Sequence, residues 1–192
     1  MEHFDIYDEN GNPTSERIER SLAHEKGVLH AAVHIYIYRI NCGRYEILLQ
    51  KRADDKDSFP SCYDTSCAGH VSAGDSFEKT ALKELSEELG VTVNITSLTH
   101  AFDQLVEKIN VFHGKTFIDR EFNKVYLLNY DAPEDSFTFQ KDEISALKWM
   151  DADELLYELE CKNPDYCIMT DTYKKALSTL KSEGFGKEGF PK

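Results

Sequence analysis

The segment at residues 75–90 (DSFEKTALKELSEELG) constrains the fold more than any other part of the chain. Apolar side chains recur there at the spacing of one face of an α-helix, at Phe77, Ala81, Leu82, Leu85 and Leu89. Asp75 and Glu78 have the spacing of a capping box, with Asp in place of the usual Ser or Thr, and Gly90 stands where a glycine commonly ends a helix. The segment therefore predicts an amphipathic helix.

Runs rich in β-branched and aromatic residues predict strands on both sides of this helix. Ala31–Arg39 and Tyr45–Lys51 form an expected hairpin around a turn at Asn41–Gly43. A short strand and turn are expected within 4–13, a helical turn or loop at 15–25, and further strands at 91–95, 98–107, 115–130 and 144–150. Helices at 151–160 and 170–182 follow, capped by Asp151 and Thr170. This order predicts an α+β fold, a sandwich containing a mixed β-sheet.

The overall charge limits the partners of the chain. Its 192 residues carry a net charge of −13, from 22 Lys and Arg against 35 Asp and Glu. That length suits one domain, and no repeat or long linker divides it. The acidic balance repels a phosphate backbone, so no nucleic-acid polymer is expected as a partner.

Targeting signals and cysteines bear on the compartment. The N-terminal sequence lacks a basic segment followed by an apolar stretch, so no secretory signal is expected. No apolar run approaches the ~20 residues of a membrane helix, so no membrane partner is expected. The five cysteines form an odd set whose spacing matches no strong zinc pattern. These features predict a cytoplasmic protein with reduced thiols, and they leave open whether the chain forms a homodimer.

Three carboxylates share one face of the predicted helix, because Glu84, Glu87 and Glu88 lie three and four residues apart. Such a face has two interpretations. It is either a solvated acidic surface or a site for a divalent cation, since Mg²⁺ is held by a few carboxylates together with substrate phosphates. The residues around the helix favour the second interpretation.

The 23 residues from Gly69 to Val91 contain Gly, five residues, Asp75, seven residues and then KELSEELGV. This pattern closely resembles the Nudix box, in which Gly, five residues, Glu and seven residues precede Arg-Glu-apolar-any-Glu-Glu-any-Gly-apolar. Asp75 replaces the first Glu and Lys83 replaces the Arg, and both keep their charge. Lys lacks the planar fork with which Arg fixes a carboxylate, so this departure affects how the metal-binding glutamate is oriented.

The resemblance implies a Nudix pyrophosphohydrolase that depends on Mg²⁺, with Mn²⁺ as an alternative. Its substrate would be a nucleoside diphosphate derivative or a related small organic diphosphate, and its fold a Nudix-type α/β/α sandwich. Glu84 and Glu88 would ligate the metal, with Glu87 as a further ligand or neighbouring carboxylate and the Gly69 carbonyl joining them. The candidate catalytic residues are Glu84, Glu87 and Glu121. The general base varies within the family, and Glu84 or an acid outside the box, such as Glu121, is expected in that role.

Residues upstream of the box are similar to the isopentenyl-diphosphate-isomerase-like branch of the Nudix superfamily. The similarity covers the stretches FDIYDENGN, LLQKR and AGH, at residues 4–12, 48–52 and 68–70. Arg52 and Lys56 match positions that hold the diphosphate in the isomerases, and together with Lys51 and His70 they are the expected substrate-binding residues. Arg provides planar bidentate contacts to phosphate, and Lys adds a mobile point charge.

The isomerases use a catalytic Cys followed by Gly and His, whereas this chain has Ala68-Gly69-His70. Cys67 lies one residue earlier, which in a strand points its side chain to the opposite face. Asp119 and Glu121 match a pair of later acids. The resemblance thus implies, as an alternative to surface histidines, a second metal site formed by His24, His30, His70 and Glu121. An isopentenyl-diphosphate isomerase and a non-catalytic binding module remain the alternative functions.

These features together predict a single Nudix domain over residues 1–192. Within it, residues 1–28 form an N-terminal extension, 69–91 the Nudix box and 151–192 the C-terminal helices. A small-molecule diphosphate is the expected partner, because a divalent cation on the acidic helix face would turn a repulsive surface into one that binds phosphate.

Overall fold

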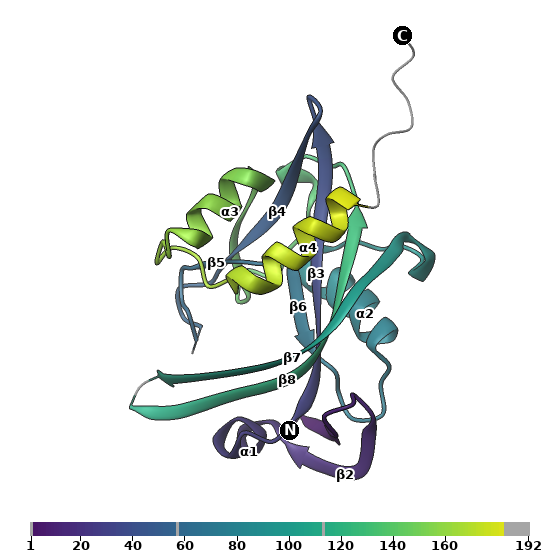
Figure 1. Cartoon of the computed structure of the whole chain (residues 1–192), viewed down its shortest axis with the longest axis vertical. Helices are drawn as coiled ribbons and strands as arrows, with labels where there is room; N and C mark the ends of the chain where they lie inside the picture. The colour runs from purple at the N-terminus through teal and green to yellow at the C-terminus, as the bar shows by residue number, and fades with distance from the viewer. Residues whose placement is uncertain (1, 57, 113, 183–192) are drawn as a thin grey trace.

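A mixed β-sheet forms the middle layer of the protein, with helices on both of its faces (Figure 1). The computed structural model describes residues 2–56, 58–112 and 114–182. Its strands are β1 (His3–Tyr7), β2 (Pro13–Glu19), β3 (His30–Asn41), β4 (Arg44–Arg52), β5 (Tyr63–Asp64), β6 (Cys67–His70), β7 (Leu98–Phe112), β8 (Lys115–Asn129) and β9 (Ile144–Asp151). Its α-helices are α1 (Arg20–Lys26), α2 (Phe77–Leu89), α3 (Ala152–Glu160) and α4 (Thr170–Ser182). The expected α+β fold is confirmed.

The main sheet has the order β5-β4-β3-β8-β7, with β6 also paired to β3 and β9 to β4. β3 runs parallel to β8 and antiparallel to β4 and β6, so the sheet is mixed as predicted. β1 and β2 form a separate antiparallel hairpin. Because β3 and β8 pair in the register His30 to Glu121, the start of β3 meets the middle of β8, and residues far apart in the sequence come together there.

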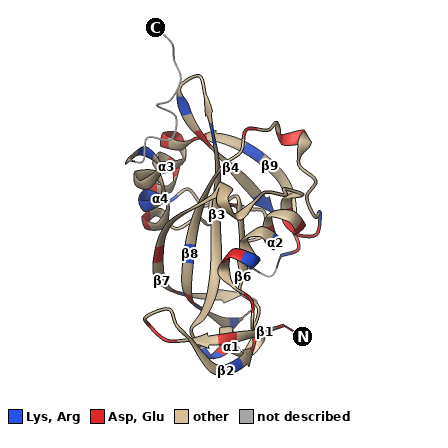
Figure 2. Ribbon diagram, turned by 90° about the vertical axis from the view of Figure 1, so that its right-hand side faces the viewer, with Lys and Arg blue, Asp and Glu red and all other residues tan. Residues whose placement is uncertain are grey.

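The two faces of the sheet bury separate cores, because successive side chains of a strand point to opposite faces. On β3, Ile35 and Ile37 belong to the core that contains Leu85 of α2. Tyr36 and Tyr38 belong to the core that α3 and α4 cover. Figure 2 shows α2 on one side of the strands and α3 and α4 on the other. The apolar stripe of α2 therefore fixes the direction in which its acidic face points.

The ends of α2 differ slightly from expectation. The N-cap is Ser76 rather than Asp75, and its hydroxyl oxygen accepts a hydrogen bond of 3.2 Å from the Lys79 N–H. Asp75 forms an ion pair with Lys79 instead, so its prediction as the cap was wrong. Gly90 ends the helix as predicted, with a left-handed φ of 68° that a residue with a side chain adopts only at a cost.

The connection after α2 is not the strand expected at 91–95. Residues 91–94 are irregular, and a 3₁₀ turn at Ile95–Ser97 follows. The Asn94 side chain accepts a hydrogen bond of 3.0 Å from the Thr96 N–H, and this local bond favours a turn over a strand. The hairpin expected after it is confirmed, and β7 continues five residues beyond 107.

The secondary structure near the two ends of the chain largely agrees with what the sequence predicts. Residues 15–25, expected as a helical turn or loop, complete β2 and form most of α1. Asp151 caps α3 by accepting hydrogen bonds from the Asp153 and Glu154 N–H groups. The expected C-terminal unit reaches residue 192, and its part after residue 182 lies outside the described residues. Within the described part of the chain, no helix is long and apolar enough to cross a membrane.

Candidate functional site

A cavity of about 420 Å³ opens beside the acidic face of α2. Its other walls come from β3, β6, the inner face of the β7–β8 hairpin and the loop after β4. Seven of the expected site side chains and Gly69 line this cavity, namely Arg52, Lys56, His70, Glu84, Glu87, Glu88 and Glu121. Lys51 does not line it, because adjacent residues of a strand point to opposite faces, and its Nζ lies 6.0 Å from the centre of the Tyr63 ring.

Gly69 of β6 and Glu84 of α2 touch across the gap between strand and helix. A Cβ atom added to Gly69 would lie 2.5 Å from the Cδ of Glu84, which is closer than two carbon atoms can approach. The side chain of Glu84 is 16% exposed and that of Glu87 is 52% exposed. The glycine of the box therefore leaves the space that one of its glutamates occupies.

The carboxylates on α2 carry more negative charge than their neighbours compensate. Burial, together with nearby Glu84, raises the pKa of Glu88 to about 8. Burial also raises the pKa of Glu84, and Lys83 opposes this rise from 3.9 Å. Oε2 of Glu88 is buried and has no hydrogen-bond partner among the described residues. Crowded carboxylates with an unsatisfied oxygen fit a divalent cation, which would supply both the charge and the missing contact.

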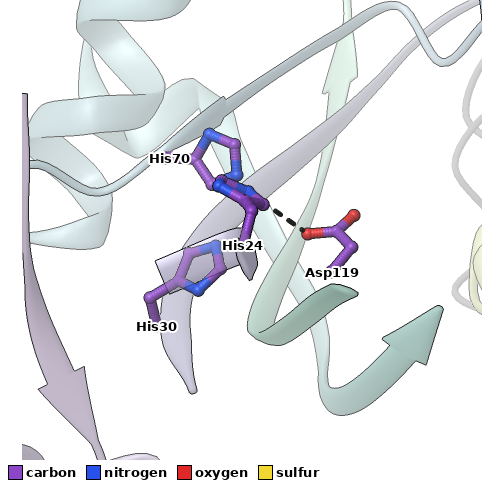
Figure 3. Close-up of side chains that lie close together, drawn as sticks. All are labelled: His24, His30, His70 and Asp119. Atoms are coloured by element: carbon purple, nitrogen blue, oxygen red, sulfur yellow. Dashed lines mark ion pairs between the residues drawn. The ribbon is translucent and has the colours of Figure 1, made fainter. Parts of the chain in front are cut away.

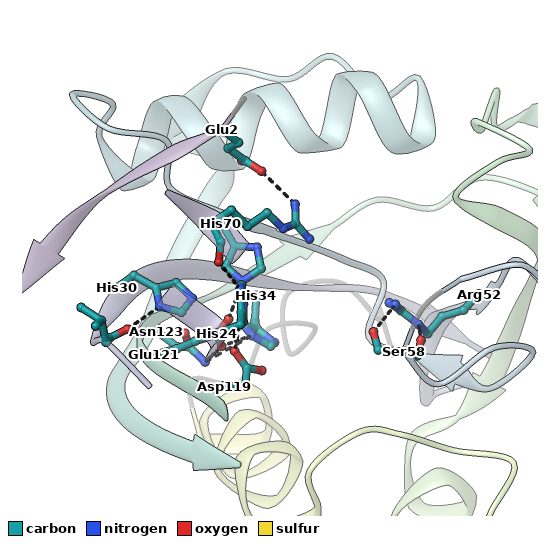
Figure 4. Close-up of polar contacts among 12 residues, drawn as sticks. Glu2, His24, His30, His34, Arg52, Ser58, His70, Asp119, Glu121 and Asn123 are labelled. Carbon is teal, nitrogen blue, oxygen red and sulfur yellow. Dashed lines mark hydrogen bonds and ion pairs between the residues drawn. The ribbon is translucent and has the colours of Figure 1, made fainter. Parts of the chain in front are cut away.

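Two of the expected phosphate-binding residues lie in the cavity wall and are held by neighbours. Nε of Arg52 donates a hydrogen bond of 3.0 Å to the Ser58 carbonyl (Figure 4). Its Nη1 lies 3.5 Å from a carboxylate oxygen of Asp64. Lys56 forms an ion pair with Glu143, which also lines the cavity. Both cations therefore lie near the site, and each is paired with a carboxylate. An anionic ligand would compete with that carboxylate for the cation.

A further cation that the sequence analysis missed reaches the cavity from α1. Nη1 of Arg20 lies 2.8 Å from a carboxylate oxygen of Glu2, and both residues line the cavity. The available signal was its spacing, because Arg20 precedes His24 by one helical turn and so lies on the same side of the helix.

Three histidines from separate elements converge next to the acidic face (Figure 3). His24 comes from α1, His30 begins β3 and His70 ends β6. One ligand atom of each, together with a carboxylate oxygen of Asp119 from β8, lie within 4.8 Å of one another. Among the described residues, the Nε2 atoms of all three histidines and Oδ1 of Asp119 are buried without a hydrogen-bond partner. Nε2 of His70 lies 3.1 Å from Oε1 of Glu121, and Nε2 of His24 lies 3.7 Å from Oδ1 of Asp119, so ion-pair contacts compensate the burial of these atoms only in part. A bound cation would relieve the remaining cost.

The rings of two of these histidines are held in one tautomer. Nδ1 of His24 lies 2.8 Å from the Arg20 carbonyl, and Nδ1 of His30 lies 2.8 Å from the Val28 carbonyl. A carbonyl only accepts, so each Nδ1 carries the proton and each Nε2 turns its lone pair toward the cluster. Burial lowers the pKa of both rings to about 4, so both are neutral at pH 7. Imidazole lone pairs with one carboxylate are a donor set for zinc or a transition metal.

Aromatic rings support this cluster from two sides. Phe4 of β1 is fully buried, and its ring centre lies 4.8 Å from that of His30 and 4.9 Å from that of His70, in stacked arrangements. Phe117 of β8 stacks on His24 at 4.3 Å. The N-terminal hairpin and β8 thus pack against this cluster, of which His70 lines the cavity.

Glu121 lies beside the histidine cluster and was expected within it. Its Oε1 is 3.1 Å from Nε2 of His70, and its Oε2 is 3.7 Å from Nε2 of His34 and accepts a 3.0 Å hydrogen bond from Asn123 Nδ2. Burial acts to raise the pKa of Glu121, but the contacts with His34 and His70 outweigh it and hold the pKa well below its usual range. The converging set instead includes Asp119 as its acid.

His34 also lines the cavity, although the sequence analysis did not single it out. It pairs directly with Ala68 across β3 and β6, so the two side chains lie on one face of the sheet. Cys67 is fully buried in the core under α2, on the other face, as its one-residue offset predicted. The signal for His34 was a single polar residue within the otherwise apolar and aromatic run at 31–38.

Comparisons with known sequences agree with this geometry. The NUDIX domain family matches residues 28–170. A Nudix hydrolase of Clostridium acetobutylicum is 34% identical over 161 residues, which cover 84% of this chain and 75% of that protein. Nudix hydrolase 3 of Arabidopsis thaliana is 39% identical over 86% of this chain, but the match spans only 21% of the plant protein. An isopentenyl-diphosphate Delta-isomerase of Aliivibrio fischeri is 28% identical, over 93% of this chain and 97% of the isomerase.

Solved structures show the same fold. A crystal structure from Deinococcus radiodurans matches with a TM-score of 0.64 and 21% identity, over 83% of this chain and 90% of that one. A Caenorhabditis elegans Ap4A hydrolase matches with a TM-score of 0.53 and 22% identity, over 79% and 98% of the two chains. The chain belongs to the NUDIX domain family, and it has isomerase-like relatives as predicted. The family and these relatives support the predicted enzyme class, a Nudix pyrophosphohydrolase.

Proposed function

We propose that the protein is a Mg²⁺-dependent hydrolase that cleaves a diphosphate linkage in a nucleoside diphosphate derivative or a related small organic diphosphate. The observation that carries this proposal is the group of three glutamates on α2, which face a cavity and of which Glu84 is packed against Gly69. A solvated acidic surface would not require a buried, unpartnered oxygen such as Oε2 of Glu88. The relatives named Nudix hydrolases support the same reaction class.

The metal would be held by Glu84, Glu87 and Glu88, with the carbonyl oxygen of Gly69 as a further ligand. These are oxygen donors, which Mg²⁺ prefers, and Mn²⁺ would be accepted in its place. When bound, the metal supplies charge neutralisation on the phosphoryl oxygens and lowers the pKa of a water molecule. The glutamates would orient that water molecule for attack on phosphorus.

The two candidate general bases differ in their surroundings. Burial raises the pKa of Glu84, whereas contacts with His34 and His70 hold that of Glu121 well below its usual range. A carboxylate with a higher pKa is the stronger base, so we assign proton abstraction to Glu84. Glu121 would then act as a positioning residue that holds His70 in the cavity wall.

The diphosphate would be bound by cations that line the cavity. Arg52 and Lys56 keep the roles that the isomerase-like resemblance implies, and the ring of His70 adds a donor. Lys51 lies outside the cavity, so we propose that it acts only through the general positive potential of this strand. Arg20 and Lys83 line the cavity next to the acidic face and would contribute contacts to the phosphoryl oxygens.

A panel of nucleoside diphosphate derivatives, incubated with Mg²⁺, tests this function. We expect at least one of them to be cleaved at the phosphoanhydride bond, with no reaction in the presence of a chelator. Glu88→Gln should lower kcat by about 100-fold or more, since it removes a buried electrostatic contact with the reacting group. Glu78→Gln, on the same helix but outside the cavity, is the matched control. The hydrolase assignment is wrong if no member of the panel is cleaved, or if Glu88→Gln matches the wild type.

We further propose that His24, His30, His70 and Asp119 hold a second metal, zinc or a transition metal, that ties α1 to the sheet. Their ligand atoms converge and are buried without hydrogen-bond partners among the described residues, which supports this assignment. The test is metal content after gel filtration in buffer containing Zn²⁺ or Mn²⁺. Wild-type protein should retain about one ion per chain and His30→Gln should retain none. His100→Gln, at an exposed position on β7, should behave as the wild type.

Isomerisation of isopentenyl diphosphate is the second candidate function. It is favoured by the extent of the match to isopentenyl-diphosphate Delta-isomerases and by the histidine cluster. Ala68 stands against it, because the reacting thiol of the resembled isomerases would occupy that position. Formation of dimethylallyl diphosphate without release of phosphate would establish this alternative. Binding of a diphosphate without any turnover would indicate a non-catalytic binding module.

We also propose that the protein is cytoplasmic. All five cysteines are free, which suits a reducing compartment. Cell fractionation with an antibody against the chain would locate it. The homodimer that the sequence left open stays a prediction, which sedimentation of the purified protein would check.

A further inference from the structure

Most cations that line the cavity face a carboxylate. Among the described residues, these pairs are Arg20 with Glu2, Arg52 with Asp64, Lys56 with Glu143, and Lys83 with Glu84 and Glu87. In an acidic chain with a net charge of −13, such pairing is the expected state of a basic side chain. Each of these cations is neutralised in place before any ligand enters.

Lys108 of β7 is different, although it lines the same cavity. In the part of the chain that the structure describes, no carboxylate lies within ion-pair distance of its Nζ. Its contacts are the Cys167 carbonyl at 3.4 Å and the face of the Phe59 ring, whose centre lies 4.5 Å away. Its cross-strand neighbour Asp119 turns toward His24 instead, at 3.7 Å. The half-buried ammonium group thus has an aromatic face and one long hydrogen bond, but no counter-charge.

Phe59 itself is held in an uncommon backbone conformation. Its φ is 47°, in the left-handed region that a bulky residue adopts only with strain, and Ser61 two residues later has a φ of 61°. Strained residues of this kind gather at ligand-binding positions, where the surrounding structure maintains them. The loop after β4 therefore places the Phe59 ring in the cavity at the expense of local backbone energy.

We propose that Lys108 and Phe59 form a subsite for a phosphate group that the substrate carries in addition to the cleaved diphosphate. This inference rests on the proposed hydrolase function and narrows its substrate class to diphosphates with a further phosphate on the organic part. The cations near α2 serve the diphosphate, whereas Lys108 lies on the β7 wall and is free of a carboxylate competitor. The ring of Phe59 keeps water from one side of the ammonium group, which strengthens its attraction to an anion.

Two matched pairs of ligands test the subsite, NADP⁺ against NAD⁺ and coenzyme A against its dephospho form. Within each pair the diphosphate is shared and one ribose phosphate differs. Dissociation constants are measured by calorimetry with Ca²⁺ in place of Mg²⁺, because Ca²⁺ also takes oxygen ligands. In at least one pair, the phosphorylated ligand should bind the wild type about tenfold more tightly. This ratio corresponds to the free energy that one hydrogen bond to a charged group contributes to binding.

Variants separate the subsite from general charge effects. Lys108→Met keeps the apolar stem on Phe59 and should abolish the preference, whereas Lys108→Arg should retain it. Lys175→Met is the matched control, because Lys175 also lies over an aromatic ring, that of Phe102 at 5.7 Å, but outside the cavity. Equal or unmeasurable binding within both pairs, or an unchanged preference in Lys108→Met, would overturn the proposal. A preference for the phosphorylated ligand without cleavage of any diphosphate would retain the subsite and contradict the hydrolase.

Discussion

Gly69 in β6 and Glu84 in the middle of α2 are packed so closely that no side chain fits between them. A Cβ atom at position 69 would lie 2.5 Å from the Cδ and 2.8 Å from the Oε1 of Glu84. No positive φ explains this glycine, since its backbone is that of an ordinary strand residue. The glycine is therefore needed because it leaves space for the side chain of Glu84. It fixes the position of this glutamate, which we assign to metal binding and to proton abstraction.

Gly69→Ala should lower kcat by about 100-fold, because a displacement of about 1 Å in a positioned group has an effect of this size. The thermal midpoint should change little, since Glu84 can swing toward solvent. The measurement is steady-state kinetics together with thermal unfolding. Gly43→Ala is the control, because Gly43 has a φ of 79° and open space around it, so its substitution strains the backbone far from the cavity. Full activity in Gly69→Ala would contradict the assigned role of Glu84.

Glu88→Gln should stabilise the metal-free protein, and the gain should grow as the pH rises. The folded-state pKa of Glu88 is about 8, against an ordinary value near 4.5. Between these values the unfolded chain has already lost the proton that the folded chain keeps, so wild-type stability falls as the pH rises. The variant lacks this titration. Thermal unfolding in a chelator from pH 5 to pH 9 should show a widening advantage for the variant, and a constant difference would contradict the account.

His30→Gln should have the opposite pH dependence in metal-free protein. Burial lowers the pKa of His30 to about 4 in the folded chain, whereas the unfolded chain takes up the proton near 6.5. The contribution of the neutral His30 ring to the wild-type free energy of unfolding is therefore fully present above about pH 6.5. It is lost as the pH falls toward 4. The variant should lose less of its thermal midpoint than the wild type between pH 7.5 and pH 4.5. Parallel curves for the two proteins would show that His30 is not held neutral by burial.

Leu85→Ala should destabilise the protein by ~2–5 kcal/mol, because Leu85 is fully buried between α2 and the sheet. For a chain of this size, each kcal/mol corresponds to ~2–4 °C in the thermal midpoint. Leu105→Ala, on β7 with 47% of the residue exposed, should change the midpoint by a fraction of that amount. Equal effects of the two substitutions would contradict the assignment of Leu85 to the core.

The helix α2 and its glutamates could be predicted from the sequence because their signals are local. The apolar spacing, the final glycine and the offsets of the box all lie within 23 residues, and the structure places Leu85 in the core and Glu84 at the cavity. Local sequence patterns predicted the secondary structure less well where tertiary contacts determine it. The Val91–Ile95 stretch has strand-like residues, yet Val91 packs into the core under α2 and Asn94 begins a turn.

The histidine cluster could be suggested by resemblance but not assembled from the pattern. His24, His30 and His70 lie on three elements, and their meeting depends on the parallel register that sets His30 beside Glu121 of β8. No periodicity in the sequence reports such a register between distant strands. The side on which Lys51 points was likewise readable only once β4 was placed in the sheet, since Arg52 next to it lines the cavity.

The most direct test of the central claim is the fate of solvent oxygen. Cleavage of a nucleoside diphosphate derivative in ¹⁸O-labelled water, with Mg²⁺ present, should place one labelled oxygen on one of the two phosphate products, as read by mass spectrometry. Glu88→Gln should form the labelled product about 100-fold or more slowly, and the chelated wild type should form none. Rearrangement of the substrate without cleavage, or products that carry no label, would contradict the claim that the glutamates of α2 direct water at phosphorus.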